Sequence, residues 1–584
     1  MEKTIADDLA EKHKSISVAE FFEKNRHLLG FDSKLKAMLT CVKEAVDNSL
    51  DACEEYSFEL HKRGKPPELP DILVRVDQEA GEVFKIIVED NGPGLMPSVI
   101  PRAFGKMLYG SKFHRLKQGR GQQGIGIHAA VLYSQLTTGK PARIISKIGK
   151  DHPAHIIELF INTKLNEPDV KRDEDYPKFS KDHGTRVELS MEGKYVATGD
   201  KSIYEYLKRT SVVNPHAKIT FIDPSGQTFN FKRSTDQMPL ETKEIKPHPW
   251  GIELGVLTRM LKETKKNTMV SFLTEEFSKV GAVNAKSILE NSKVDPKRKP
   301  DSVIFEEAQL LLKSLEKAEL QRPPTDCLSP VGRGAIEKSL RSEYNPEFIV
   351  ATTRPPEVYR GYPFQVEAAL AYGGDIPENE SAKIMRIANK VPLLYESGAC
   401  AITEAINDMD WKRYGVNKPS GSSIPQAPLI ILVHFCSVWV PFTSESKAAI
   451  ASYPVILKEM KLALQECARQ LQVFLHKKMK AKHEAQRMGT FVKYSGVMAK
   501  ALSDLTRKNE KEISEVIKRV IEKKYGSNSK ILEAEKAIKE DSAKKAESDN
   551  TKKEVKKEEG DDEEDGKARG SRKGKSGKNK NSEE

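Results

Sequence analysis

At 584 residues the chain is too long for a single hydrophobic core, so three or four domains are expected. Charged residues make up 31% and hydrophobic residues 38% of the chain, which describes a soluble protein, and its six cysteines include no CxxC pair, which argues against a disulfide framework and a zinc site. The net charge of +11 favours an anionic partner such as nucleic acid, although part of that excess lies in the C-terminal tail.

Residues 1 to about 240 are predicted to form an α+β layer. An amphipathic helix is expected around residues 38–53, and alternating apolar and polar residues are typical of short strands in five later segments. Those segments are 71–77, 83–90, 154–163, 184–191 and 217–223. Helices that cover a sheet with a partly polar face would give this pattern.

Strand patterns stop from about 241 to 330, where three segments have helical periodicity: 255–264, 269–281 and 282–294, with a glycine turn between the last two. From about 331 strands return, at 347–356, 362–374 and 428–440, before a long helical run from Pro454 onward. The sequence therefore predicts three domains, at 1–240, 241–330 and 331–505.

Residues 506–584 are predicted to be a charged helix followed by a tail. The helix is expected at 509–526, and beyond about 540 the chain has almost no apolar residue. Such a segment cannot offset the entropy lost on ordering, so we expect disorder there. The longest apolar stretch, 428–442, contains His434 and is too short to span a bilayer, and no signal peptide is visible, so we expect a cytoplasmic protein.

The helix KEAVDNSLDA, residues 43–52, carries a narrow polar line. At about 100° per residue, Glu44, Asn48 and Asp51 fall within about 60° of one another, opposite an apolar face. That face consists of Met38, Leu39, Val42, Val46, Leu50 and Cys53. In a lone helix a solvated surface explains the line; a catalytic face explains it if neighbouring motifs bind an anion.

Two glycine-rich motifs follow that helix. In VEDNGPGL, Asp90 ends a strand, and Gly92 and Gly94 leave room for close approach to the backbone. In GRGQQGIGIHAAV, residues 119–131, four glycines precede a helix whose first amides can bind phosphate. The chain therefore carries the parts of an anion site, although NGPG by itself is an ordinary turn.

Two common nucleotide folds are excluded. Gly119, Gly121 and Gly124 have the spacing G-x-G-x-x-G, but the preceding FHRLKQ is basic rather than strand-like, and no acidic residue follows about 20 positions on. A P-loop is absent too, because Arg569 replaces the first glycine before the GKS at 574–576.

The acid and the amide one helical turn apart fit a third kind of nucleotide site. Asn48 offers the hard oxygen ligand that Mg²⁺ prefers, and Glu44 beside it can deprotonate an attacking water. Asp90 can accept a hydrogen bond from the adenine amino group, and the hydroxyl of Thr185 in GTRVEL can bridge to that aspartate or to the base. The order ExxxN, DxGxG, glycine-rich lid and GT is a strong joint signal for ATP and Mg²⁺.

These motifs resemble the Bergerat ATP-binding fold shared by gyrase, the ninety-kilodalton heat-shock chaperones, histidine kinases and MutL. KEAVDNSLDA, EDNGPGL and GRGQQGIGIHA resemble most closely the B subunits of archaeal type IIB DNA topoisomerases, and the resemblance covers residues 15 to about 505. It implies a multidomain α+β fold with a Bergerat-fold ATPase domain, a helix-two-turn-helix insert and an α/β transducer domain with a long C-terminal helix.

The resemblance also implies roles for single residues. The ATP lid would contain Ser111 and Lys112, and then Gly119, Arg120, Gly121, Gln122, Gln123, Gly124, Ile125 and Gly126. The transducer domain would supply Lys447, in its strand–loop–helix segment, to the γ-phosphate. Lys390 competes for this role, but its surroundings are those of an ordinary strand start.

No tyrosine nucleophile or acidic cleavage cluster is evident. We interpret the DED at 173–175 and the DMD at 408–410 as solvated loop charge, so DNA cleavage would belong to the A subunit, docked at residues 489–506. The resemblance implies an A2B2 heterotetramer on double-stranded DNA, near the nucleoid of an archaeal cell, whose B subunits dimerise on ATP. A MutL-like repair clamp and an ATP-dependent chaperone remain alternatives; a histidine kinase is disfavoured, because no membrane span appears.

Overall fold

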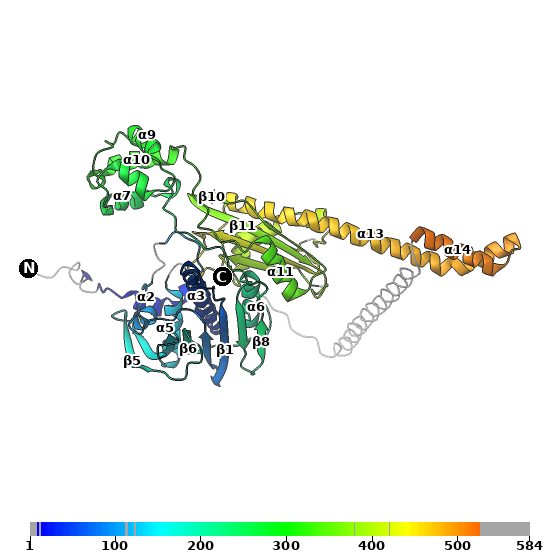
Figure 1. Ribbon diagram of the computed structural model, residues 1–584, viewed down its shortest axis with the longest axis horizontal. Helices are drawn as coiled ribbons and strands as arrows, with labels where there is room; N and C mark the ends of the chain where they lie inside the picture. Colours follow the sequence, from blue (N-terminus) through cyan, green and yellow to red (C-terminus); the bar gives the residue numbers. More distant parts are fainter. Residues whose placement is uncertain are drawn as a thin grey trace, which may run out of the picture. The chain divides into compact units, whose positions relative to one another are not determined.

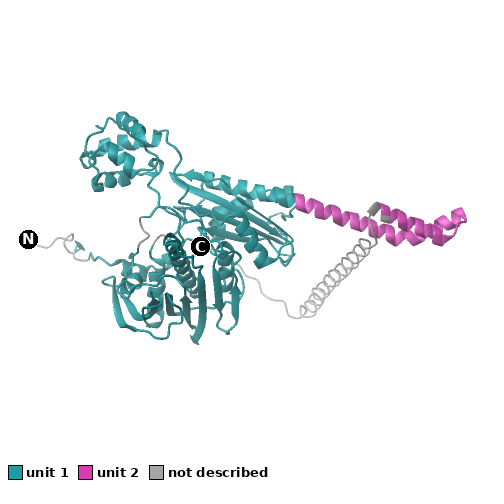
Figure 2. Ribbon diagram, in the orientation of Figure 1, with its two compact units in different colours: residues 1–472 teal, residues 473–584 magenta. Residues whose placement is uncertain are grey.

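The computed structural model describes residues 9–10, 13–110, 115–121, 124–378, 380–419 and 421–525. The chain divides into two compact units, residues 1–472 and 473–584 (Figure 2). The first unit contains two sheets and a group of helices between them in sequence (Figure 1). The predicted boundaries within it stay predictions, and the tail beyond 540 lies outside the described residues.

The first sheet has eight strands in the order β5-β4-β3-β6-β2-β1-β7-β8, all antiparallel except the parallel pair β1 and β7. Its strands are β1 (Asp71–Ala80), β2 (Val83–Glu89), β3 (Ala142–Lys147), β4 (His155–Asn162), β5 (Glu167–Asp175), β6 (Gly184–Glu192), β7 (Lys218–Ile222) and β8 (Thr228–Phe231). All five predicted strands are confirmed. The strands β3, β5 and β8 were not predicted from the sequence.

The edge strand β5 shows why polar strands escape prediction. Its sequence, EPDVKRDED, has no buried residue, so no alternation marks it. Interpreting Asp173–Asp175 as loop charge was wrong, because the backbone of these residues pairs with β4 and Asp173 contacts His155. Asp408 and Asp410 cap the helical segments α12 (Ala401–Asn407) and η5 (Trp411–Tyr414).

Helices pack against this sheet around one apolar core. They are α2 (Val18–Lys24), η1 (Arg26–Leu29), α3 (Lys34–Lys62), α4 (Ile100–Gly105), α5 (Gly126–Thr138) and α6 (Ile203–Val213). The hydroxyl of Ser33 caps α3 by accepting from the Lys36 amide. The whole apolar face predicted for α3 is buried, with exposures of 0–3%. Burying that face fixes the rotation of the helix and therefore the direction of its polar line.

Residues 249–317 form a separate helical group with its own apolar core. Its elements are η2 (Pro249–Gly251), α7 (Leu254–Glu263), α8 (Met269–Glu276), α9 (Ala282–Ser292), η3 (Pro300–Ser302) and α10 (Phe305–Lys317). Gly281 caps α9, so the predicted glycine turn and its flanking helices are confirmed.

The second sheet has the order β10-β11-β14-β12-β13, with β9 also paired to β11. Its strands are β9 (Phe348–Thr353), β10 (Glu357–Tyr359), β11 (Tyr362–Tyr372), β12 (Lys383–Ala388), β13 (Val391–Pro392) and β14 (Leu429–Ser437), and α11 (Arg333–Tyr344), η4 (Ser397–Ala399) and α12 accompany it. Every residue of β14 is buried, which explains the continuous apolar run there.

The long helix α13 (Pro454–Thr506) begins in the first unit and ends in the second, which also contains α14 (Glu510–Tyr525). Within the second unit, Met488 of α13 and Ile521 of α14 are buried in a small apolar cluster. Both predicted helices are confirmed. Across the described residues, the structure contains no helix of sufficient length and apolarity to span a membrane.

Candidate functional site

A cavity of about 580 Å³ opens beside α3, with the end of β2, the start of β6 and the start of α5 around it. Nine of the predicted site residues line it: Glu44, Asn48, Asp90, Gly94, Gly121, Gly124, Gly126, Thr185 and Lys447. The first and last of these residues are about 400 positions apart, so the fold brings together motifs that are distant along the chain.

Asp90 lies at the cavity wall, directly after β2, with 5% of its surface exposed. One carboxylate oxygen accepts from the backbone N–H groups of Gly92 at 2.9 Å and Thr185 at 3.1 Å. The other oxygen accepts from the Ser49 hydroxyl at 2.8 Å. Burial raises the pKa of Asp90, although these three bonds lower it. A carboxylate has about four acceptor positions, so one remains for a ligand in the cavity.

The predicted role of Thr185 needs one correction. Its backbone N–H, and not its hydroxyl, contacts Asp90, while the hydroxyl lies 3.2 Å from the Ser146 hydroxyl. Gly184 makes this approach possible, because a Cβ there would lie 2.2 Å from the carbonyl oxygen of Asp90. The GT pair therefore brings the β6 backbone against Asp90.

Glu44 and Asn48 face the glycine-rich segment that leads into α5. A Cβ on Gly126 would lie 1.8 Å from a carboxylate oxygen of Glu44, so only glycine fits at the start of α5 while Glu44 holds this position. The amide oxygen of Asn48 lies 3.6 Å from the position of a Cβ on Gly121. Both side chains of the predicted catalytic face therefore point towards the lid.

The charge of Glu44 is balanced from two directions. Burial alone would raise its pKa, but Lys43, 2.9 Å away, and Lys447 outweigh burial and leave the pKa below its ordinary value. Lys447 follows β14 in a loop and has a φ of 53°. Burial lowers the pKa of Lys447, and Glu44 opposes that shift. The second sheet thus places a lysine at a cavity built mainly by the first.

Asp51, the third residue of the polar line, faces Arg120. Nη1 of Arg120 donates to Asp51 at 2.8 Å and to Glu54 at 2.9 Å, and the arginine is 7% exposed. The Arg120 side chain therefore braces α3, and it does not line the cavity.

The remaining predicted residues divide into two groups. Gly92, Gly119, Arg120 and Ile125 do not line the cavity, whereas Ser111, Lys112, Gln122 and Gln123 lie outside the described residues. The sequence analysis missed Ser49 and an apolar wall that includes Leu95, Val99, Phe104, Tyr109 and Val187. The apolar residues that follow NGPG in the sequence could have indicated this wall. Such a wall can pack against the flat ring of a nucleotide base.

Comparison with known proteins identifies the family. The model described as topoisomerase VI B subunit, transducer, matches residues 323–487, and the model described as histidine kinase-, DNA gyrase B- and HSP90-like ATPase matches residues 37–171. The type 2 DNA topoisomerase 6 B subunit of Methanosarcina barkeri is 48% identical over 521 residues, which cover 89% of this chain and 82% of that protein. The chain belongs to the family of type 2 DNA topoisomerase 6 B subunits.

Two further relatives agree. The type 2 DNA topoisomerase 6 B subunit of Archaeoglobus fulgidus is 47% identical, covering 88% of this chain and 83% of that protein. The relative from Thermococcus gammatolerans is 36% identical, covering 91% of this chain and its entire own length. The chain therefore carries the nucleotide-binding ATPase of a type IIB topoisomerase. The matched ATPase region contains Glu44, Asn48, Asp90 and the lid, and the matched transducer region contains Lys447.

Asp47 lies on α3, one residue before Asn48, and is 4% exposed. It accepts from the Tyr206 hydroxyl at 3.1 Å, and the ammonium of Lys43 lies 3.7 Å away. Burial raises the pKa of Asp47 to about 6, because it outweighs the attraction of Lys43. The folded chain therefore holds this proton more tightly than the unfolded chain, whose carboxyl titrates near 4. The resulting stabilisation is complete below about pH 4 and is lost as the pH rises through 6.

We expect Asp47→Asn to raise the melting temperature at pH 7.5 and to leave it unchanged at pH 4, where Asp47 is already neutral. The gain at pH 7.5 corresponds to at most about 3 kcal/mol, from about two pKa units. Thermal unfolding of both chains from pH 4 to pH 8 measures it. A difference that does not depend on pH would contradict the shifted titration.

Proposed function

We propose that this cavity binds ATP with Mg²⁺ and that hydrolysis there drives a DNA clamp. In this proposal two B subunits dimerise around duplex DNA when they bind ATP. They belong to an A2B2 assembly whose A subunits cut one duplex so that a second duplex passes through the break. The observation that carries the proposal is that Glu44, on a helix packed against the first sheet, and Lys447, in the loop after the last strand of the second sheet, line one cavity. ATP binding and domain movement can be coupled there, because both depend on the same phosphates.

The residues at the cavity suit the separate parts of the nucleotide. Asp90, with its remaining acceptor position, would read the adenine amino group, and the start of α5 would bind the phosphates with its free amides. The Asn48 oxygen would hold Mg²⁺, which neutralises phosphate charge when bound. Glu44 has a lowered pKa and is ionised, so it can accept a proton from the attacking water. Lys447 would stabilise charge at the γ-phosphate.

The A subunit would dock on residues 489–506 of α13. This segment exposes a run of large apolar side chains: Tyr494 (54%), Val497 (66%), Met498 (43%), Leu502 (39%) and Leu505 (80%). A contiguous apolar surface of this kind marks an interaction site in a soluble protein. The family is named for a B subunit, which supports a second kind of subunit as the occupant.

The proposal as a whole is tested by ATP turnover and decatenation. Turnover should rise when duplex DNA is added to the complex with the A subunit, and decatenation should require ATP and both subunits. Decatenation without the A subunit, or turnover indifferent to DNA in the complex, would contradict the proposed division of labour.

The catalytic roles on α3 can be separated by two variants. We expect Glu44→Ala to keep ATP binding and to lose hydrolysis on the order of a hundredfold or more, because it removes the general base. Asn48→Ala should lose the Mg²⁺-dependent part of ATP affinity, measured by titration with and without the metal. Glu59→Ala, an exposed position on the same helix, is the control and should change neither. Hydrolysis by Glu44→Ala at the wild-type rate would remove Glu44 from this role.

Base selection should depend on Asp90. We expect Asp90→Asn to weaken ATP binding by about 1–3 kcal/mol. The NH₂ group of asparagine would face hydrogen-bond donors, namely the Asp90 partners in the wild type or the adenine amino group, and cannot accept from them. The preference of the variant for ATP over GTP should fall as well. Competition titrations with both nucleotides measure the change, and unfolding curves check that the fold is intact. If the wild-type chain bound GTP as tightly as ATP, Asp90 would not read adenine.

Lys447 should act only through the γ-phosphate. We expect Lys447→Ala to lower turnover and to uncouple ATP binding from movement of the second sheet, while ADP affinity stays unchanged. Affinities for ADP and an ATP analogue, together with X-ray scattering, measure these effects. Lys458→Ala, an exposed lysine at the start of α13, is the control. Normal ATP-dependent closure in Lys447→Ala would show that Lys447 does not couple ATP binding to this movement.

A further inference from the structure

A second lysine of the second sheet, Lys390, lies outside the site but is connected to its lid. We propose that the turn Asn389–Lys390, between β12 and β13, is a positioning element that holds lid residues 118–120 in register with the strand leading to Lys447. This inference rests on the proposed function, because it assigns the anchoring of the same nucleotide lid.

The turn has a conformation that disfavours lysine. Ala388 pairs with Val391, so Asn389 and Lys390 form a two-residue hairpin, and their φ values are 47° and 65°. A turn with two positive φ values favours Asn at the first position and Gly at the second. Lysine at the second position costs free energy that glycine would not, so its side chain must contribute something in return.

Three consecutive lid residues bond to this turn or to its direct neighbours. The Gln118 amide oxygen accepts from the Ser329 backbone N–H at 2.7 Å, and its NH₂ group donates to the Ser329 carbonyl at 3.1 Å. The Gly119 carbonyl accepts from the Asn389 side chain at 3.2 Å. Arg120 donates to Asn214, whose NH₂ group donates to the Lys390 carbonyl at 3.1 Å.

The Lys390 ammonium completes this set. It is buried, with 5% of the residue exposed, and it donates to the Ser329 hydroxyl at 2.9 Å. Burial lowers the pKa of Lys390, while Glu54 on α3 raises it. Ser329 is thus held by Gln118 through its backbone and by Lys390 through its side chain. The lid and the turn share one anchor.

The turn is equally tied to β14. The Asn389 NH₂ group donates to the Ser437 carbonyl at 2.8 Å, and the Ser437 N–H donates to the Asn389 amide oxygen at 2.9 Å. The Lys390 backbone N–H donates to Nε2 of His434 at 2.9 Å. Ser437 is the last residue of β14, ten positions before Lys447. A shift of residues 118–120 would therefore reach the strand that leads to Lys447 through the side chain of Asn389.

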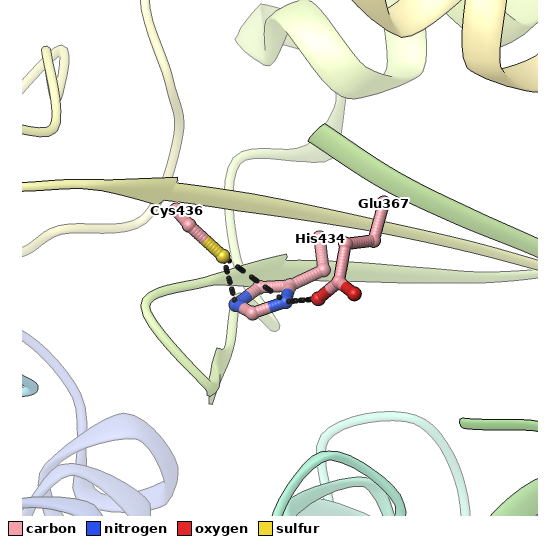
Figure 3. A group of neighbouring side chains, drawn as sticks. All are labelled: Glu367, His434 and Cys436. Carbon is pink, nitrogen blue, oxygen red and sulfur yellow. Dashed lines mark hydrogen bonds and ion pairs between the residues drawn. The ribbon is translucent and has the colours of Figure 1, made fainter. Parts of the chain in front are cut away.

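The buried cluster of Glu367, His434 and Cys436 belongs to this anchor and is not a metal site. Figure 3 shows the His434 ring between the Glu367 carboxylate and the Cys436 sulfur. Because a backbone N–H can only donate, Nε2 of His434 is an acceptor, so Nδ1 carries the hydrogen and donates to Glu367 at 2.8 Å. Both ring nitrogens are thus occupied. Glu367 also accepts from the Val331 and Gly332 amides, each at 2.8 Å.

The anchor predicts an effect that differs from that of Lys447. If residues 118–120 lose their anchor, the lid should bind every nucleotide less tightly. The backbone amides proposed to bind the phosphates follow these residues in the same segment. Removal of Lys447 acts on the γ-phosphate alone. The ratio of ADP affinity to ATP-analogue affinity therefore separates the two lysines.

The test is Lys390→Met in the full chain, which keeps most of the side-chain volume and removes a buried charge, a change that folded proteins often tolerate. We expect ADP and a non-hydrolysable ATP analogue to lose affinity equally, by about tenfold, the usual size of coupling between linked sites. Hydrogen exchange of residues 115–121 should accelerate while the melting temperature stays within a few degrees.

Two control variants make the test specific. Lys383→Met removes a lysine of β12, the strand that precedes the turn; its ammonium pairs with Glu205 at 2.7 Å, and the variant should leave both affinities unchanged. Lys390→Gly relieves the positive φ, so a purely structural turn would be indifferent to it or gain stability, whereas the anchor predicts the same affinity loss as in Lys390→Met.

The outcomes separate the two proposals. If the wild-type chain bound neither nucleotide, the proposed function would fail. If it bound both, and Lys390→Met bound them equally well with unchanged exchange at the lid base, the anchor alone would be refuted. Equal losses in Lys383→Met and Lys390→Met would also refute it, because the effect would then be a general loosening.

Discussion

Four carboxylates on one helix, three of them buried and one partly buried, impose the main constraint on this structure. Glu44, Asp47, Asp51 and Glu54 of α3 have little exposure, and buried charge is costly unless it is paired or neutralised. Burial raises the pKa of Asp47 to about 6, so this carboxylate loses its charge only below that pH, and Lys43 lies 3.7 Å from it. Glu44 is balanced by Lys43 on α3 itself and by Lys447 beyond β14. Asp51 and Glu54 are balanced by Arg120 in the lid. The lid and the second sheet are therefore tied to α3 by charge.

This charge balance explains how one helix serves two purposes. Near its middle, Glu44 and Asn48 face the cavity, where a polar side chain can act on a ligand. One to three turns later, Asp51 and Glu54 accept hydrogen bonds from Arg120 and have a structural role. The burial of the apolar face fixes both directions at once. A helix without this apolar stripe could not hold Glu44 and Asn48 at the cavity while Asp51 and Glu54 bond to Arg120.

Periodicity and motif order predicted most of the fold. The α3 helix, its polar line and the strands β1, β2, β4, β6 and β7 all have strong local signals, and the resemblance of three motifs to one family predicted the site. Signals failed where burial was absent or where a partner was distant. The strand β5 has no apolar face, and nothing near Arg120 indicates that α3 would take its side chain.

Lys390 illustrates the second kind of failure most clearly. In sequence it precedes an apolar strand and looks ordinary, because the neighbouring residues indicate neither its positive φ nor its burial. Its partners, Ser329, His434 and Asn214, lie between 44 and 176 residues away. A sequence pattern cannot report contacts of that range. The one local hint is the Asn-Lys pair at a hairpin position, where a glycine would relieve the backbone.

The same charge balance gives a physical account of nucleotide coupling. Lys447 interacts with the ionised Glu44 across the cavity. Phosphates that enter between them would add negative charge and compete for Lys447, so its strongest anionic partner would change from Glu44 on α3 to the nucleotide. After release of the γ-phosphate, Glu44 would again be the strongest anionic influence on Lys447. Two states of one loop, each with its own anion, are sufficient to make the second sheet respond to hydrolysis.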